Sequence, residues 1–279
     1  MEVELNFGQE HDVHSPWTPR PRARQSPSSY QYLLDLDVDL AEELDLRMRL
    51  AARPAVTANT FDVDTGQVRL NESLAIASEG PGVLVLEGVL AVNVRVGGRI
   101  ATELLGAGDL VEPRQDAFED LLACEIDWRA LVPVRFAVLD ASFSERVRPW
   151  PQIMQALLRR TERRTRNLNV QRAITSQPRL EVRLALLLWH LSARWGKVEP
   201  GGILLPIPLT HQLLGRLVGA ERPSVSHALA RLSRAELVTG QGDEWHLHGS
   251  LDDQLASMIE PVTARIDQLA DAGPGHRRH

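Results

Sequence analysis

Residues 209–248 constrain the fold most, because they carry start and turn signals for two short helices. Thr210 precedes an apolar periodic segment over 211–218, and its hydroxyl is suited to cap the first helix N–H groups. Gly219 marks a tight turn, and Pro223 fits the first turn of a second helix, where a missing N–H costs nothing. The pattern predicts a helix-turn-helix. Its inward side chains are expected to be Leu213, Leu214, Leu217, Val225, Ala228, Leu229 and Leu232.

The second predicted helix, about residues 222–236, presents small polar and arginine side chains beside its apolar face. A helix of this kind can enter the major groove of DNA with its N-terminal side chains at the base edges. Residues 237–247 follow with two strand-like runs around a glycine turn. These runs predict a wing, so the whole unit is expected to be a winged helix-turn-helix.

The run from Leu209 to Leu232 resembles the Crp/Fnr family of bacterial regulators. It has the family's pattern of Thr-x-Gln, Gly, Arg-x-x-Val and a following Leu. The resemblance implies that Arg222 reads a guanine, for which a bidentate hydrogen-bond pair has a clear physical basis. The family often has Glu at position 223 and Arg at position 227, whereas this chain has Pro223 and His227. The operator sequence therefore stays open.

The resemblance implies a sequence-specific transcription regulator that binds double-stranded DNA at a pseudo-palindromic operator as a homodimer. RNA polymerase is a further candidate partner, and activation and repression are both open. The alternative is an oligomerisation or protein-interaction module of the same fold that has lost DNA binding. The first interpretation is favoured by Arg222 and by the basic residues Arg216, Arg231 and Arg234. The residues expected at DNA are Thr210, His211, Gln212, Arg222, Ser224, Ser226, His227 and Arg231.

A long helical pattern over residues 144–175 precedes the winged unit. It has one apolar stripe and many arginines, among them Arg159, Arg160, Arg163, Arg164 and Arg166, which are expected on an exposed side. A long helix with a single stripe usually packs against a partner helix. We therefore expect dimerisation through this helix. The stripe consists of Val147, Trp150, Met154, Leu157, Thr161 and Leu168.

Residues 31–143 carry short β-rich runs, and Gly97-Gly98 between two of them is a strong hairpin signal. One helix is plausible over 33–50, where leucines fall near helical spacing. The expected class is α+β: an N-terminal β-roll of the cyclic-nucleotide-binding kind, a long dimerisation helix and a C-terminal winged helix-turn-helix. The expected divisions are a flexible tail (1–30), the roll (31–143), the helix (144–175), the winged domain (176–250) and a C-terminal helix and tail (251–279).

The roll departs from the family's cyclic-nucleotide cassette, in which a Gly-Glu pair and a later Arg hold the phosphate. Gly106-Ala107-Gly108-Asp109 resembles the approach to the cassette, but Glu112-Pro113 replaces Gly-Glu and Leu122-Ala123 replaces the arginine. Proline also removes an N–H donor. Classical cyclic AMP binding is not expected, although Arg114 or Arg129 could substitute. The ligand is unknown, and a nucleotide-binding module acting without DNA is disfavoured.

The composition of the chain narrows the classes of protein to which it can belong. The net charge is −6, but residues 31–143 hold 20 acidic and 9 basic residues, while 144–175 hold 8 arginines and 2 glutamates. Residues 176–250, the region expected near phosphate, hold 8 basic and 6 acidic residues and are mildly basic. With Cys124 as the one cysteine, we expect a buried thiol, no iron–sulfur cluster, no metal and no cofactor. No enzyme motif, membrane span or signal peptide is recognised, so a cytoplasmic non-enzyme is expected.

Overall fold

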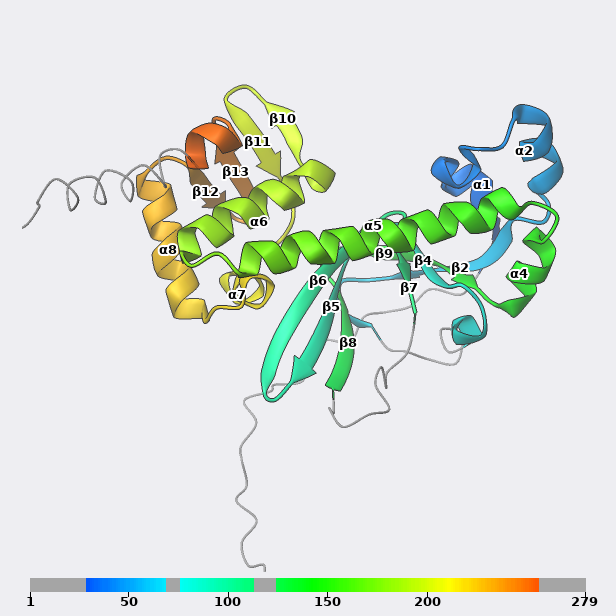
Figure 1. Cartoon of the computed structure of the whole chain (residues 1–279), viewed down its shortest axis with the longest axis horizontal. Helices are drawn as coiled ribbons and strands as arrows, with labels where there is room; N and C mark the ends of the chain where they lie inside the picture. The colour runs from blue at the N-terminus through cyan, green and yellow to red at the C-terminus, as the bar shows by residue number, and fades with distance from the viewer. Residues whose placement is uncertain (1–28, 69–75, 113–123, 256–279) are drawn as a thin grey trace, which may run out of the picture.

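The computed structural model describes residues 29–68, 76–112 and 124–255 (Figure 1). The expected tail up to residue 28, the cassette positions 113–123 and the segment from 256 onward lie outside these residues. Residues 29 and 30 are expected within the tail, but Ser29–Tyr32 form strand β1, which pairs with β2. The alternating serine, tyrosine and glutamine side chains suit such an edge strand.

Two antiparallel sheets form the β-roll. One has the order β1-β2-β9-β4-β7 and the other β3-β8-β5-β6. The tip of the β5–β6 hairpin is Gly97-Gly98, with φ of +52° and +77°, as a two-residue primed turn requires. The predicted hairpin is therefore confirmed. The strands are β1 (Ser29–Tyr32), β2 (Thr57–Val63), β3 (Gly66–Val68), β4 (Gly82–Glu87), β5 (Val89–Val96), β6 (Arg99–Gly106), β7 (Leu110–Val111), β8 (Cys124–Ala130) and β9 (Val134–Leu139).

The interior of the roll is filled by large apolar side chains from both sheets. Phe61, Trp128 and Phe136 are buried there, and the Phe136 ring centroid lies 5.4 Å from that of Phe61 and 6.3 Å from that of Trp128. Alternation along the strands sends Leu90 and Leu105 into this interior.

The single helix expected over 33–50 is wrong. The segment divides into α1 (Leu33–Leu36), a 3-10 turn (Val38–Ala41) and α2 (Leu46–Ala52). Asp45 starts α2, because its carboxylate accepts a 2.7 Å hydrogen bond from the backbone N–H of Met48. Leu46, one of the leucines at helical spacing, is 75 % exposed.

The long helical pattern also divides. Helix α4 (Ala141–Val147) ends before α5 (Pro151–Thr175), with Trp150 at the N-cap of α5. The break follows from Pro149 and Pro151, because each lacks an N–H and disfavours helical backbone at the preceding residue. Helix α5 then runs along the whole molecule, from the roll to the winged domain (Figure 1).

The winged domain begins with α6 (Leu180–Trp195) and contains the predicted pair of short helices. A four-stranded sheet of order β10-β11-β13-β12 lies beside them. All seven side chains expected inside the helix pair are buried. The remaining elements are β10 (Lys197–Glu199), β11 (Gly202–Leu205), α7 (His211–Val218), α8 (Arg222–Arg234), β12 (Val238–Gln241) and β13 (Glu244–His248).

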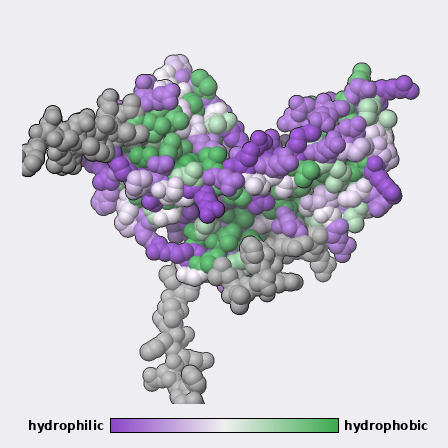
Figure 2. Space-filling view, viewed as in Figure 1, coloured by the Kyte–Doolittle hydropathy of each residue, from purple (hydrophilic) through white to green (hydrophobic). Residues whose placement is uncertain are grey.

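The winged domain packs against the outer face of the β5–β6 sheet. Val89, Ala91 and Leu104 point away from the roll interior and share one apolar cluster with side chains of α6, α7 and α8. Figure 2 shows the two lobes with a notch between them and hydrophilic side chains along α5. None of the described helices is long and apolar enough to cross a membrane.

Candidate nucleic-acid interface

Local signals set the geometry of α7 and α8. The hydroxyl of Thr210 accepts a 3.2 Å hydrogen bond from the N–H of Leu213, which caps α7. Gly219 ends α7 with φ of +69°, a left-handed conformation that favours glycine. Pro223 lies in the first turn of α8. These residues set where α7 ends and where α8 begins.

The N-terminal end of α8 is open to solvent. Arg222, Ser224 and His227 are exposed, as are Thr210 and Gln212 at the start of α7. Within the described part of the chain, the Arg222 guanidinium has no hydrogen-bond or ion-pair partner. It therefore carries a positive charge that is free to meet a base edge or a phosphate.

Two of the expected DNA-contacting side chains bind each other. His211 Nδ1 lies 2.8 Å from the Ser226 hydroxyl, which donates a 3.1 Å hydrogen bond to the Arg222 carbonyl. Because the hydroxyl proton is used there, the imidazole donates from Nδ1. The pair ties α7 to α8, and both side chains are only half-exposed. Their first role is to fix the angle between the two helices.

Arg231 is also less free than expected, because its guanidinium forms an ion pair with Glu181 of α6. The arginine side chain is 56 % exposed and the glutamate 15 %. Glu181 is a residue that the motif alone does not reveal. No sequence signal links it to Arg231, since the two lie on helices that only the fold brings together.

Glu181→Gln is expected to strengthen DNA binding at low salt, because it releases Arg231 for a phosphate. One added phosphate contact should steepen the dependence of log K on log salt by about 1. Fluorescence anisotropy at several salt concentrations measures this slope. Glu199→Gln removes the same charge from exposed strand β10 and is the matched control. An equal change in both variants would assign the effect to net charge alone.

The tip of the roll's hairpin also reaches the helix-turn-helix. Arg99 Nη1 lies 2.6 Å from Glu221 Oε1, and both side chains are largely exposed. Glu221 is the N-cap residue of α8 and directly precedes Arg222. Exposed ion pairs contribute little to stability. The contact nevertheless places an arginine against the carboxylate that would otherwise repel DNA phosphate at this helix end.

The wing is the hairpin of β12 and β13, with Gln241 opposite Glu244. Gly242 has φ of +61° in its turn. The Thr239 hydroxyl lies 2.9 Å from His248 Nε2, which joins the two strands. Asp243 and Glu244 stand exposed at the tip. Their negative charges disfavour a phosphate contact by the tip itself.

The expected dimer stripe divides between two faces of the α4–α5 segment. Val147, Trp150 and Leu157 pack into an apolar cluster of their own chain, with Val147 and Leu157 buried. Their expected placement on an outward seam is therefore wrong. Met154 and Leu168 are 37 % and 41 % exposed. The outward stripe, at helical spacing, consists of Met154, Leu158, Thr161, Thr165 and Leu168.

The expectation that all the α5 arginines are exposed is also wrong. Arg160 is buried and donates to Asp37 over 2.7 Å from Nη2. Arg164 donates to Glu103 over 2.8 Å. Burial has the largest single effect on Arg164 and lowers its pKa. The hydrogen bonds to Glu103, together with the negative charges of Glu103 and Asp109, outweigh burial and raise the pKa overall. These two pairs fasten α5 to the roll.

The described residues contain no group of three histidine, cysteine or acidic side chains that could hold a metal ion. Cys124 begins β8 and is half-exposed, so the expectation of a buried thiol is wrong. Arg129 lies on β8 opposite Ala91. Arg114 falls outside the described residues.

The geometry defines a winged helix-turn-helix joined to a β-roll by a long helix. A scan of family models matches residues 182–248 to the Crp-like helix-turn-helix domain. A search of curated proteins by sequence gives no match. The domain and the roll together confirm the resemblance to the Crp/Fnr family, and DNA-binding transcription regulator is the class of protein that they support.

Solved structures with this fold come from several bacteria. A CRP-family transcriptional regulator from Thermus thermophilus is 20 % identical, with a TM-score of 0.51 over 71 % of this chain and 93 % of that one. The c-di-GMP responsive global regulator CLP of Xanthomonas campestris is 18 % identical, with a TM-score of 0.52 over 69 % of this chain and 95 % of that one. FixK2 from Bradyrhizobium japonicum is 16 % identical, with a TM-score of 0.52 over 69 % of this chain and 93 % of that one. At these identities the similarity establishes the fold.

Proposed function

We propose that the chain is a sequence-specific transcription regulator that binds double-stranded DNA with the N-terminal end of α8 in the major groove. The observation that carries the proposal is the exposed Arg222 guanidinium, unpartnered among the described residues, on a helix held by Thr210 and Gly219. Ser224 and His227 lie on the same exposed end. Thr210 and Gln212, both exposed at the start of α7, are the further DNA contacts of this proposal.

We propose further that the regulator acts as a homodimer through the outward stripe of α5. Met154, Leu158 and Leu168 leave apolar surface in water on one side of a long helix. Burial of such side chains against a second copy would stabilise a dimer by roughly 1.5–3 kcal/mol each if complete. Two-fold symmetry then requires a pseudo-palindromic operator with half-sites about one helical turn apart, roughly 34 Å. RNA polymerase stays a candidate partner at the promoter.

Selection from random DNA tests the proposal. The full chain is incubated with a random duplex pool in moderate salt, and the bound DNA is sequenced over several rounds. The proposal predicts enrichment of one sequence with dyad symmetry. Failure to enrich any sequence while dimers still form would favour the alternative of an oligomerisation module without DNA binding.

The roll is not expected to bind cyclic AMP or cyclic GMP. Phe61, Trp128 and Phe136 fill its interior, and the sequence lacks both phosphate anchors of the family cassette. A buried phosphate without donors would cost several kcal/mol. Isothermal titration should show no binding up to about 1 mM. Micromolar binding abolished by Arg129→Ala would contradict this prediction.

A further inference from the structure

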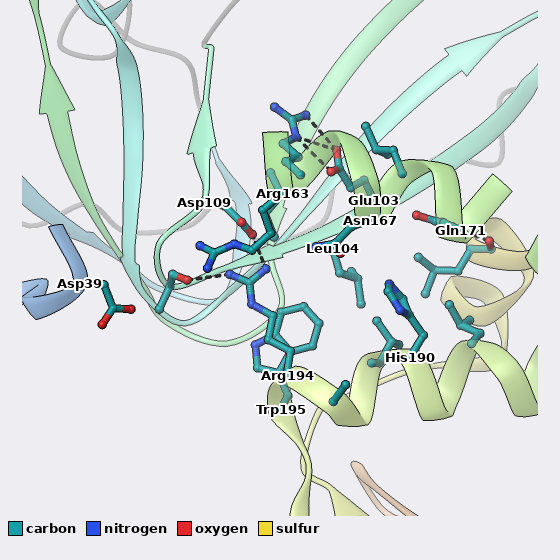
Figure 3. A pocket seen from close by; sticks show the side chains of 18 residues that line it. Asp39, Glu103, Leu104, Asp109, Arg163, Asn167, Gln171, His190, Arg194 and Trp195 are labelled. Carbon is teal, nitrogen blue, oxygen red and sulfur yellow. Dashed lines mark hydrogen bonds and ion pairs between the residues drawn. The ribbon is translucent and has the colours of Figure 1, made fainter. Parts of the chain in front are cut away.

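A pocket of about 340 Å³ lies outside the roll, between β6, the C-terminal half of α5 and α6 (Figure 3). This volume lies within the range of small-molecule sites. The pocket opens on the outer face of the sheet, so it is separate from the filled roll interior. Its walls come from the roll, the long helix and the winged domain.

A buried carboxylate oxygen in this pocket lacks a partner. Asp109 is 1 % exposed, and its Oδ2 accepts hydrogen bonds from the Gly106 N–H over 2.9 Å and from Arg194 Nη1 over 2.5 Å. Its Oδ1 has no hydrogen-bond partner among the described residues. A buried acceptor left unpaired destabilises the folded chain. A ligand that donates a hydrogen bond to Oδ1 would remove this destabilisation.

Arg163 supplies a cation beside the same turn. Figure 3 shows the Arg163 side chain extending from α5 toward Asp109. Its guanidinium lies close to the turn at Gly108: a Cβ added to that glycine would be 3.3 Å from Arg163 Nη2. Arg164 and Arg194 are neutralised by Glu103 and Asp109. Arg163 has no ion pair or hydrogen bond to the residues that the structure describes.

The rest of the pocket offers neutral hydrogen-bonding groups and an apolar wall. His190 and Asn167 line it without hydrogen-bond partners in the described part of the chain, and burial lowers the pKa of His190. Leu187 and Trp195 provide the wall. Asp39 also lines the pocket but lies apart from these groups in Figure 3.

We propose that this pocket binds a small organic acid that also carries a hydrogen-bond donor. The acid group pairs with Arg163, the donor reaches Asp109 Oδ1, and the apolar body packs on Leu187 and Trp195. Oδ1 is closed to solvent in this structure. The ligand therefore has to displace a neighbouring side chain for its donor to reach that oxygen. Such a ligand would favour the present arrangement of the two domains, because it contacts both.

A matched chemical panel tests the proposal on the full chain by ligand-observed NMR and calorimetry. It contains hydroxy- and amino-carboxylic acids of about 10–15 non-hydrogen atoms, their methyl esters without the anion, and the corresponding acids without the donor. At least one acid should bind with Kd below about 100 µM, and its ester and donor-free analogue should bind about tenfold more weakly or worse.

Variants locate the site. Arg163→Gln should weaken the acid about tenfold and remove its advantage over the ester, whereas Arg166→Gln, on the same helix outside the pocket, should leave Kd within a factor of about two. His190→Trp should block binding by filling the cavity. Absence of binding by every acid, equal loss in both arginine variants, or binding unchanged in both Arg163→Gln and His190→Trp would overturn the proposal.

Discussion

Replacing Met154 and Leu158 with aspartate is expected to convert the regulator to monomers and to reduce operator affinity by several orders of magnitude. Both side chains point outward from α5, with exposures of 37 % and 60 %. In a dimer seam, each aspartate would bury an unpaired charge, which costs several kcal/mol. Sedimentation or multi-angle light scattering at micromolar concentration measures the mass.

The control variant, Gln155→Asp with Ala173→Asp, adds the same charge at exposed positions of α5 to one side of the stripe. It should stay dimeric. Leu157→Ala should have a different effect, because Leu157 is buried in its own chain. This substitution should lower the free energy of unfolding by about 2–5 kcal/mol and leave the mass of the folded protein unchanged. Dimers that persist in the Met154/Leu158 variant would place the interface elsewhere.

Arg222→Ala is expected to cost about 1–3 kcal/mol in affinity for the operator and to relax base preference at one position in each half-site. The reason is the loss of a bidentate contact to a base edge, made from the first residue of α8. Competition binding against operators mutated one base pair at a time measures both effects.

Arg234→Ala is the matched control, because it removes the same charge from the last turn of α8. It should weaken specific and random DNA alike, if at all, and leave the base preference intact. Should Arg222→Ala weaken all sequences equally, Arg222 would be a phosphate contact, and specificity would have to come from Ser224, His227 or DNA shape.

The helix-turn-helix is predictable because its signals are local. Thr210 caps its own helix, Gly219 has the left-handed backbone of the turn, and Pro223 lies in the first turn of α8. The hairpin at Gly97-Gly98 is predictable for the same reason. Each signal acts within a few residues, so one sequence is enough to recognise it.

The partners of the charged side chains are not predictable. Arg160 meets Asp37 across 123 residues, and Arg194 meets Asp109 across 85. Only the packing of α5 and α6 on the roll brings these groups together. An arginine that pairs in this way has the same local sequence context as one that stays in water, which is why the sequence predicts Arg160 and Arg164 on the surface.

The proposed dimer stripe is only partly predictable. A helix that packs on its own roll and also offers a second face has two apolar stripes, and these overlap in sequence at helical spacing. Leu157 and Leu158 are adjacent, yet one is buried in its own chain and the other is 60 % exposed. Periodicity does not separate two such faces; the position of the roll does.

If the chain binds a palindromic operator as a homodimer, two chains must bind each operator. The most direct test is a titration of the wild-type chain against the selected operator, an isolated half-site and a scrambled duplex, with stoichiometry from native mass spectrometry. We predict two chains per operator and at least about a hundredfold weaker binding to the half-site, which corresponds to about 2.7 kcal/mol. One chain per operator, or equal affinity for operator and scrambled duplex, would contradict the proposed function.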